Sequence, residues 1–181
     1  MIPASAPPGE WAQQAMRAYQ RGDLTAAAEG FRAATTGYAL AGDEAAAAEA
    51  ANNLCVALLQ ADRPQEALAC VQGTPAVFER LNDPARTAQA HGNTGSALEG
   101  CGRHAEAEAS YLRSLDGFRQ VGDREGEALI LQRLSQVRLR QGQPFEALAA
   151  MQSSLEVSPR GGLVRRWTRQ LLSLPIRLFS K

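Results

Sequence analysis

The stretch "GRHAEAEASYLRSL", residues 102–115, returns in altered form at a fixed interval along the chain. Forty residues later stands "GQPFEALAAMQSSL" (142–155), and forty residues earlier stands "DRPQEALACVQGTP" (62–75). A fourth version, "GDLTAAAEGFRAAT" (22–35), precedes these by the same step. Self-similarity at such a period predicts a stacked repeat architecture, in which each unit buries its apolar face against its neighbours.

Turn residues divide each forty-residue unit into two segments. Most are glycine or asparagine, which suit the left-handed conformation that ends a helix, whereas Asp62 adopts it less comfortably. In the second set given below, an aspartate follows three of the four members and predicts a helix N-cap. The pattern predicts two helices of roughly four turns per unit, and no useful alternation of period two predicts strands. The two turn sets are Gly22, Asp62, Gly102, Gly142 and Gly42, Asn82, Gly122, Gly162, and the predicted caps are Asp43, Asp83 and Asp123.

Other positions forty residues apart alternate in size, which predicts close helix packing with larger side chains filling the remaining space. The small sets are Ala15, Cys55, Gly95, Ser135 and Ala27, Ala67, Ala107, Ala147. The large sets are Phe31, Val71, Tyr111, Met151 and Tyr38, Phe78, Phe118. One unit departs from the pattern, because Pro75 predicts a kink or an early end of its second helix, with a short continuation over 76–81.

The pattern Trp11, Ala15, Gly22, Ala27, Phe31, Ala34 resembles the tetratricopeptide repeat family, in a long-helix variety with a forty-residue unit. HEAT-like repeats have a similar period but lack this alternation of small and large residues with glycine turns. The resemblance implies an all-α, right-handed superhelical solenoid of four helix-turn-helix repeats with a C-terminal capping helix. The expected domains are a flexible N-terminus (1–8), repeats at about 9–42, 43–82, 83–122 and 123–158, and a basic capping helix and tail (159–181).

Composition favours a soluble, cytoplasmic protein. Cys55, Cys70 and Cys101 form no CxxC motif and no even framework, which indicates a reducing compartment. The opening "MIPASAPPGEW" lacks the basic and apolar regions of a signal peptide, and no stretch approaches the ~20 apolar residues of a membrane-spanning helix.

The sequence predicts no catalytic site, no metal and no cofactor, and therefore not an enzyme. Cys101 and His104 offer one possible pair of metal ligands, whereas a structural zinc site needs four. His91 shares its repeat position with Trp11 and Leu131, which favours a packing role. Neither a GxGxxG motif nor a P-loop is present.

The family resemblance implies that the first helix of each repeat lines a concave groove and that members bind extended peptides there. Asn52 and Asn53 lie on such a helix, Asn93 is forty residues after Asn53, and Arg133 forty after Asn93. An amide can bracket a peptide unit and a guanidinium can fork onto a carboxylate. Alternatively, Asn53 and Asn93 hydrogen-bond between helices and hold the register of the stack. The other groove candidates are Glu49, Val56, Gln89, Ser96, Gln136 and Arg140.

These positions lack the lysine run of a carboxylate clamp, so an internal peptide or a folded partner fits better than a free C-terminus. The predicted function is therefore a non-catalytic scaffold or adaptor that binds a peptide segment or partner protein in the groove.

The charge distribution predicts a distinct C-terminal segment. Residues 160–181 carry five Arg, one Lys and no acid, net +6, against 13 Arg and 19 acids, net −6, in residues 1–159. Leu163, Trp167, Leu171 and Leu174 recur at helical spacing. This segment fits a cap on the last repeat better than a membrane-surface helix. The alternative function is a membrane-peripheral assembly or regulatory factor attached through residues 160–181, while an acidic body makes nucleic acid a poor third choice.

Overall fold

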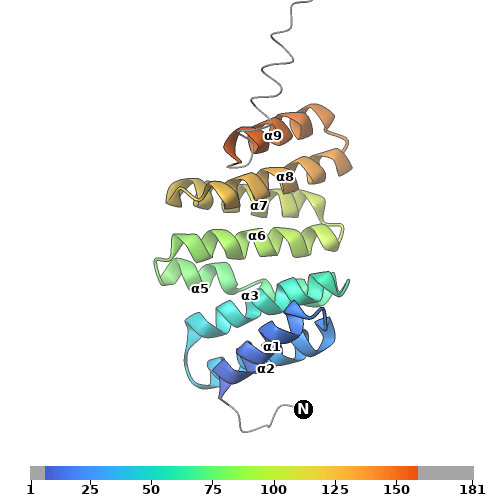
Figure 1. The fold of residues 1–181 in the computed structure, drawn as a ribbon. Coiled ribbons are helices and arrows are strands. Elements are labelled where there is room, and N and C mark those ends of the chain that lie inside the picture. Colours follow the sequence, from blue (N-terminus) through green and yellow to red (C-terminus); the bar gives the residue numbers. More distant parts are fainter. Residues whose placement is uncertain (1–6, 159–181) are drawn as a thin grey trace, which may run out of the picture.

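The computed structural model describes residues 7–158 as nine helices joined by short turns and no strands (Figure 1). The helices are α1 (Pro8–Gln20), α2 (Leu24–Leu40), α3 (Glu44–Gln60), α4 (Pro64–Val71), α5 (Thr74–Arg80), α6 (Pro84–Gly100), α7 (His104–Val121), α8 (Arg124–Arg140) and α9 (Pro144–Val157). The predicted all-α class is confirmed. The predicted capping helix over 159–181 and residues 1–6 lie outside the described residues.

Consecutive helices pair and stack along one direction, with α1 and α2 at one end and α8 and α9 at the other (Figure 1). The pairs are α1 with α2, α3 with α4 and α5, α6 with α7, and α8 with α9. This succession of pairs gives a core that continues from one pair to the next instead of a single central one.

The turns fall where the sequence predicted them. Every described member of the two turn sets has a positive φ, and the two that are not glycine have φ values of 57° at Asp62 and 53° at Asn82. The side chains of Asp43, Asp83 and Asp123 each accept a backbone N–H of the following first turn, which confirms the predicted N-caps. Local chemistry therefore sets the helix boundaries.

The break in the second pair also follows the prediction. The helix that begins at Pro64 ends at Val71, and α5 restarts at Thr74 with Pro75 in its first turn, where a missing N–H costs little. Thr74 is buried at the break, and its hydroxyl lies 2.9 Å from the carbonyl oxygen of Val71.

Small residues bring the helices of a pair into close contact, as the size alternation predicted. A Cβ built on Gly95 of α6 would lie 2.6 Å from Cδ1 of Tyr111 on α7, so only glycine leaves room for that buried ring. A Cβ on Gly30 would lie 2.8 Å from the Cβ of Ala15.

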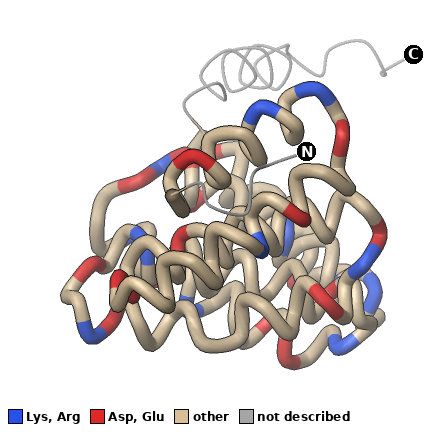
Figure 2. Tube along the Cα trace, turned by 90° about the horizontal axis from the view of Figure 1, so that it is seen from below, with Lys and Arg blue, Asp and Glu red and all other residues tan. Residues whose placement is uncertain are grey.

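Charged residues of both signs are interspersed around the periphery of the molecule, and long stretches of helix carry none (Figure 2). Among residues 7–158, no helix is both long and apolar enough to cross a bilayer.

Candidate functional site

A cavity of about 620 Å³ opens on the face formed by the first helices of the second, third and fourth pairs. Its walls include apolar side chains from all three helices, Val56 and Leu59 on α3, Ala85 on α6, and Leu129 and Ile130 on α8, together with Phe118 on α7. Its polar groups are Gln60, Arg86, Gln89, Asn93, Ser96, Asp123 and Arg133. An apolar surface with a few convergent polar groups is the usual make-up of a binding site. We call it the central cavity.

Asn93 on α6 contributes a buried polar group that lacks a hydrogen-bond partner among the described residues. Its side-chain nitrogen Nδ2 is buried and has no hydrogen-bond partner within residues 7–158. The backbone carbonyl of the same residue is contacted by the buried thiol of Cys55, at 3.8 Å. A buried amide donor without an acceptor costs ~1–3 kcal/mol, so a ligand that supplies an acceptor would recover part of that free energy on binding.

Two guanidinium groups reach the central cavity, and only one of them is engaged. Arg86 Nε lies 2.6 Å from Asp83 Oδ2, its Nη1 lies 3.6 Å from Glu49 Oε2, and its Cζ stacks 5.0 Å from the ring centroid of Phe78. Its backbone and side-chain hydrogen bonds to Asp83 hold the pKa of that carboxyl below its ordinary value. Arg133 on α8 is exposed and pairs with no carboxylate among the described residues. Arg133 is therefore the cation that remains available to an acidic ligand.

The structure brings half of the predicted groove residues into this cavity. Five of the ten line it: Val56, Gln89, Asn93, Ser96 and Arg133.

The other five lie elsewhere. Asn52 is buried and its Oδ1 accepts the Thr74 hydroxyl at 3.0 Å, so it braces the α4–α5 break. Half-buried Asn53 does not line the cavity, and Glu49 pairs with Arg86. Arg140 Nη1 lies 2.9 Å from Glu99 Oε1, and Gln136 lines a second groove at the end of the stack.

Several cavity residues escaped the sequence reasoning. Phe118 and Asp123 come from α7 and the turn after it, whereas the prediction considered first helices alone. Phe118 recurs with Tyr38 and Phe78, which marked it as a packing residue only. A Cβ built on Gly126 would lie 2.6 Å from Cδ1 of Phe118, so the absence of a side chain at Gly126 gives that ring its place.

A buried polar network lies next to the cavity and ties three helices together. The hydroxyl of Tyr111 on α7 donates to Glu99 Oε2 on α6 at 2.8 Å, and Glu99 Oε1 meets Arg140 of α8. Burial raises the pKa of Tyr111 well above its ordinary value, so the phenol stays protonated and keeps its proton for Glu99. The network fixes α6 and α8 relative to each other, and these helices carry Asn93 and Arg133.

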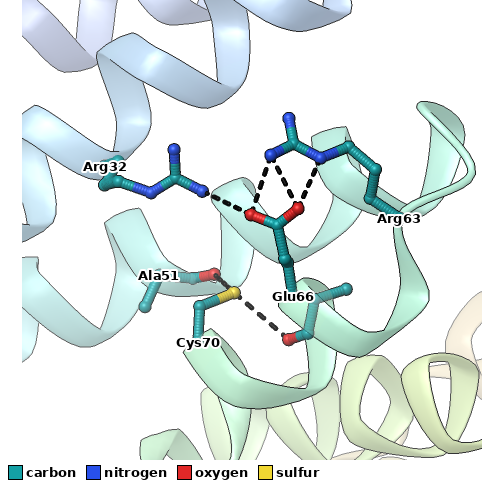
Figure 3. Close-up of polar contacts among 6 residues, drawn as sticks. Arg32, Ala51, Arg63, Glu66 and Cys70 are labelled. Carbon is teal, nitrogen blue, oxygen red and sulfur yellow. Dashed lines mark hydrogen bonds and ion pairs between the residues drawn. The ribbon is translucent and has the colours of Figure 1, made fainter.

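The α4 surface holds two structural clusters (Figure 3). Glu66 sits between Arg63, at 2.6 Å, and Arg32 of α2, at 3.1 Å, and the hydrogen bond from Arg63 lowers its pKa. The Cys70 thiol lies 3.1 Å from the carbonyl of Ala67 and contacts Cys55, and that contact together with burial raises the pKa of Cys55. Each group is occupied by partners within the fold.

No group of three His, Cys, Asp or Glu side chains in the described part of the chain is arranged to hold a metal ion. His91 is buried, its Nε2 lying 3.5 Å from Glu79 Oε1, and burial lowers its pKa.

Solved structures share this architecture. This chain matches BtubC (BKLC) from P. vanneervenii with a TM-score of 0.75 and 21% sequence identity. The match covers 83% of this chain and 62% of BtubC. The chain also matches the apo form of RapI with a TM-score of 0.75 and 12% identity, covering 88% of this chain and 45% of RapI. The TPR-like repeats of a putative kinesin light chain from Podosopora anserina match at 0.72 and 15%, covering 93% of both chains. No curated protein sequence matches the chain.

The described helices thus form a helical-repeat protein of stacked antiparallel pairs, and the chain spans less than two thirds of the first two solved relatives. The family model of the tetratricopeptide repeat matches residues 86–160, and the same fold continues through the earlier pairs. Residues 86–160 therefore match the tetratricopeptide repeat family, whose domains generally mediate interactions between proteins, and the described helices share the fold of TPR-like repeats.

Proposed function

We propose that this protein is a non-catalytic scaffold or adaptor that holds a peptide segment or a partner protein in the central cavity. The observation that carries the proposal is the buried Nδ2 of Asn93, a donor that lacks an acceptor within residues 7–158 and belongs to a residue that lines that cavity. A peptide carbonyl oxygen would satisfy it.

The cavity also indicates the chemistry of the ligand. The apolar walls suit an apolar side chain, while Arg133 is free to pair with a carboxylate beside it. Gln60 and Gln89 add amides that can donate to or accept from a peptide backbone. We therefore expect a segment that presents a bulky apolar residue close to an acidic one.

The solved relatives give this proposal a precedent in the fold alone. One of them is a Rap protein complexed with competence and sporulation factor, with 12% identity and a TM-score of 0.75. Another is the aspartyl phosphate phosphatase F of Bacillus subtilis, of which this chain covers 42%. Because the identity to the phosphatase is 11%, we carry over the architecture and not its activity.

The partner is a protein or peptide and not a nucleic acid, because the body of the chain is acidic and its charges are interspersed (Figure 2). The three free thiols suit a reducing compartment, so we place the protein in the cytoplasm. Attachment to a membrane surface through residues 160–181 depends on a segment outside the described part, and vesicle binding by that segment tests it.

A peptide library displayed on phage and selected on the purified full chain tests the proposal. Asn93→Ala should weaken the selected peptides about fivefold, since one neutral hydrogen bond contributes ~1 kcal/mol. Arg133→Gln should weaken those with an acidic residue about tenfold, because charge-assisted bonds are stronger.

The matched control is Asn53→Ala, which changes the same residue type at the equivalent position of α3, outside the cavity lining. It should bind the peptides as the parent does. Equal loss of affinity in Asn53→Ala and Asn93→Ala, or no loss in either, would show that the cavity is not the site.

A further inference from the structure

A second apolar groove, of about 520 Å³, lies at the open end of the stack between α8 and α9. We call it the terminal groove; its floor and walls include Ser135, Gln136, Leu139, Ala147, Leu148 and Met151. Leu148 is 67% exposed and Leu139 is 58% exposed. Such a cluster of exposed apolar side chains on a protein surface marks a place where something packs.

Equivalent positions in the earlier pairs show how much more exposed the side chains of α9 are. Met151 is 44% exposed, whereas Phe31, Val71 and Tyr111 at the equivalent positions of the earlier pairs are at most 2% exposed. Leu155 is 40% exposed, and its equivalent Leu115 is 5% exposed. The Met151 position is thus buried in all three earlier pairs and exposed at the end of the stack.

In the earlier pairs the cover is the first helix of the next pair. Phe31 of α2 packs in one cluster with Leu54 and Leu58 of α3. Tyr111 of α7 packs in another with Leu134 and Val137 of α8. By the same geometry, α9 requires a helix on its far side.

We propose that the terminal groove is occupied by residues 163–174 of the same chain, packed as the first helix of a fifth pair. Gly162 continues the set Gly42, Asn82 and Gly122, each of which directly precedes a capped first helix in the structure. Leu171 and Leu174 are the equivalents of Leu131 and Leu134, which are buried on α8.

The path of the chain favours this occupant over a second molecule. Helix α9 ends at Val157, and Ser158 has φ −55° and ψ 127°, the extended conformation that a following proline requires. Only residues 158–162 separate α9 from the proposed helix, so its local concentration at the groove is very high. The net charges of +6 for residues 160–181 and −6 for residues 1–159 also attract each other.

Docking would use the apolar face of residues 163–174. Leu163, Trp167, Leu171 and Leu174 recur at helical spacing and would face the groove, and Leu172 would point away from it. The arginines 165, 166 and 169 would then lie on the outer surface and supply the polar face that ends a solenoid.

Tryptophan fluorescence of the full chain tests the proposal directly. The sequence has two tryptophans, so Trp11→Phe leaves Trp167 as the reporter. We expect blue-shifted emission that iodide quenches poorly, in a protein that sediments as a monomer. Leu148→Asp in the groove and Leu171→Asp in the segment should each shift the emission to that of free indole and lower the melting temperature.

Two controls match these substitutions. Phe145→Asp introduces the same charge on α9 at a residue that is 83% exposed, and Leu172→Asp introduces it on the far side of the proposed helix. Both should leave the emission unchanged.

Three outcomes would overturn the proposal. Emission of solvent-exposed indole in the parent would show an undocked segment. Burial of Trp167 only at concentrations where the chain sediments as a dimer would assign the groove to a second copy. A blue shift only on addition of vesicles of phosphatidylserine and phosphatidylcholine would assign the segment to a membrane surface.

Discussion

Tyr111→Phe removes a single oxygen from the buried network beside the central cavity. The Tyr111 hydroxyl lies 2.8 Å from Glu99 Oε2 and 3.1 Å from Ser96 Oγ, and both Tyr111 and Glu99 are buried. Glu99 is left with Arg140, whose side chain is 55% exposed, as its cationic partner. Because a buried hydrogen bond to a charged group contributes ~1.5–3 kcal/mol, we expect a loss of ~2 kcal/mol in the free energy of unfolding. For a chain of this size that lowers the melting temperature by about 4–8 °C.

Urea unfolding followed by far-UV circular dichroism measures this loss. The matched control is Tyr19→Phe, because the Tyr19 hydroxyl accepts from exposed Gln60 Nε2, and the cost should be below ~0.5 kcal/mol. Glu99→Gln in the Tyr111→Phe background should cost less than it does alone, since the two residues share one interaction. Equal midpoints for Tyr111→Phe and the parent would refute the reasoning, because the network would then contribute nothing to stability.

Three further predictions concern stability. Burial holds the pKa of His91 below its ordinary value of 6.5, so the unfolded chain binds a proton at this residue more readily than the folded chain does. The free energy of unfolding should therefore fall from pH 7 to pH 5 in the parent, and fall less in His91→Gln. Asp62→Gly and Asn82→Gly should each raise the free energy of unfolding by ~0.5–1 kcal/mol, measured in urea, because their positive φ favours glycine. Thr74→Val should cost ~1–3 kcal/mol in the same assay, because it leaves the buried Oδ1 of Asn52 without its donor; an unchanged midpoint would contradict this.

The helix boundaries were predictable from the sequence because they depend on local chemistry. A positive φ at Gly22 and a side-chain cap at Asp43 follow from the residues at those positions and their immediate neighbours. The break at Pro75 has the same origin, since a proline acts on its own turn of helix. Repetition made the turn predictions safer, because the same turn recurred from unit to unit, whereas the break at Pro75 occurs in one unit.

The central cavity was only half predictable, because it depends on contacts between helices. Asn53 and Asn93 share a repeat position, yet only Asn93 lines the cavity. One turn before Asn53, Glu49 pairs with Arg86 and bridges α3 to α6, and the forty-residue spacing does not reveal that partner. Asn52 was likewise predicted to line the groove. In the structure its Oδ1 accepts a hydrogen bond from Thr74, which is buried there because of the break between α4 and α5.

The central cavity and the terminal groove differ in their polar groups, and this difference favours different occupants. The side chain of Asn93 is one of three with a buried, unpartnered polar atom among residues 7–158, and of these only Asn93 lines the central cavity. A polar donor without an acceptor gains from a ligand that supplies hydrogen bonds, as a peptide backbone does. The terminal groove has no such atom in its lining and leaves Met151 open where its equivalents are closed. Its occupant needs only apolar side chains at helical spacing, which the chain itself carries from residue 163 onward.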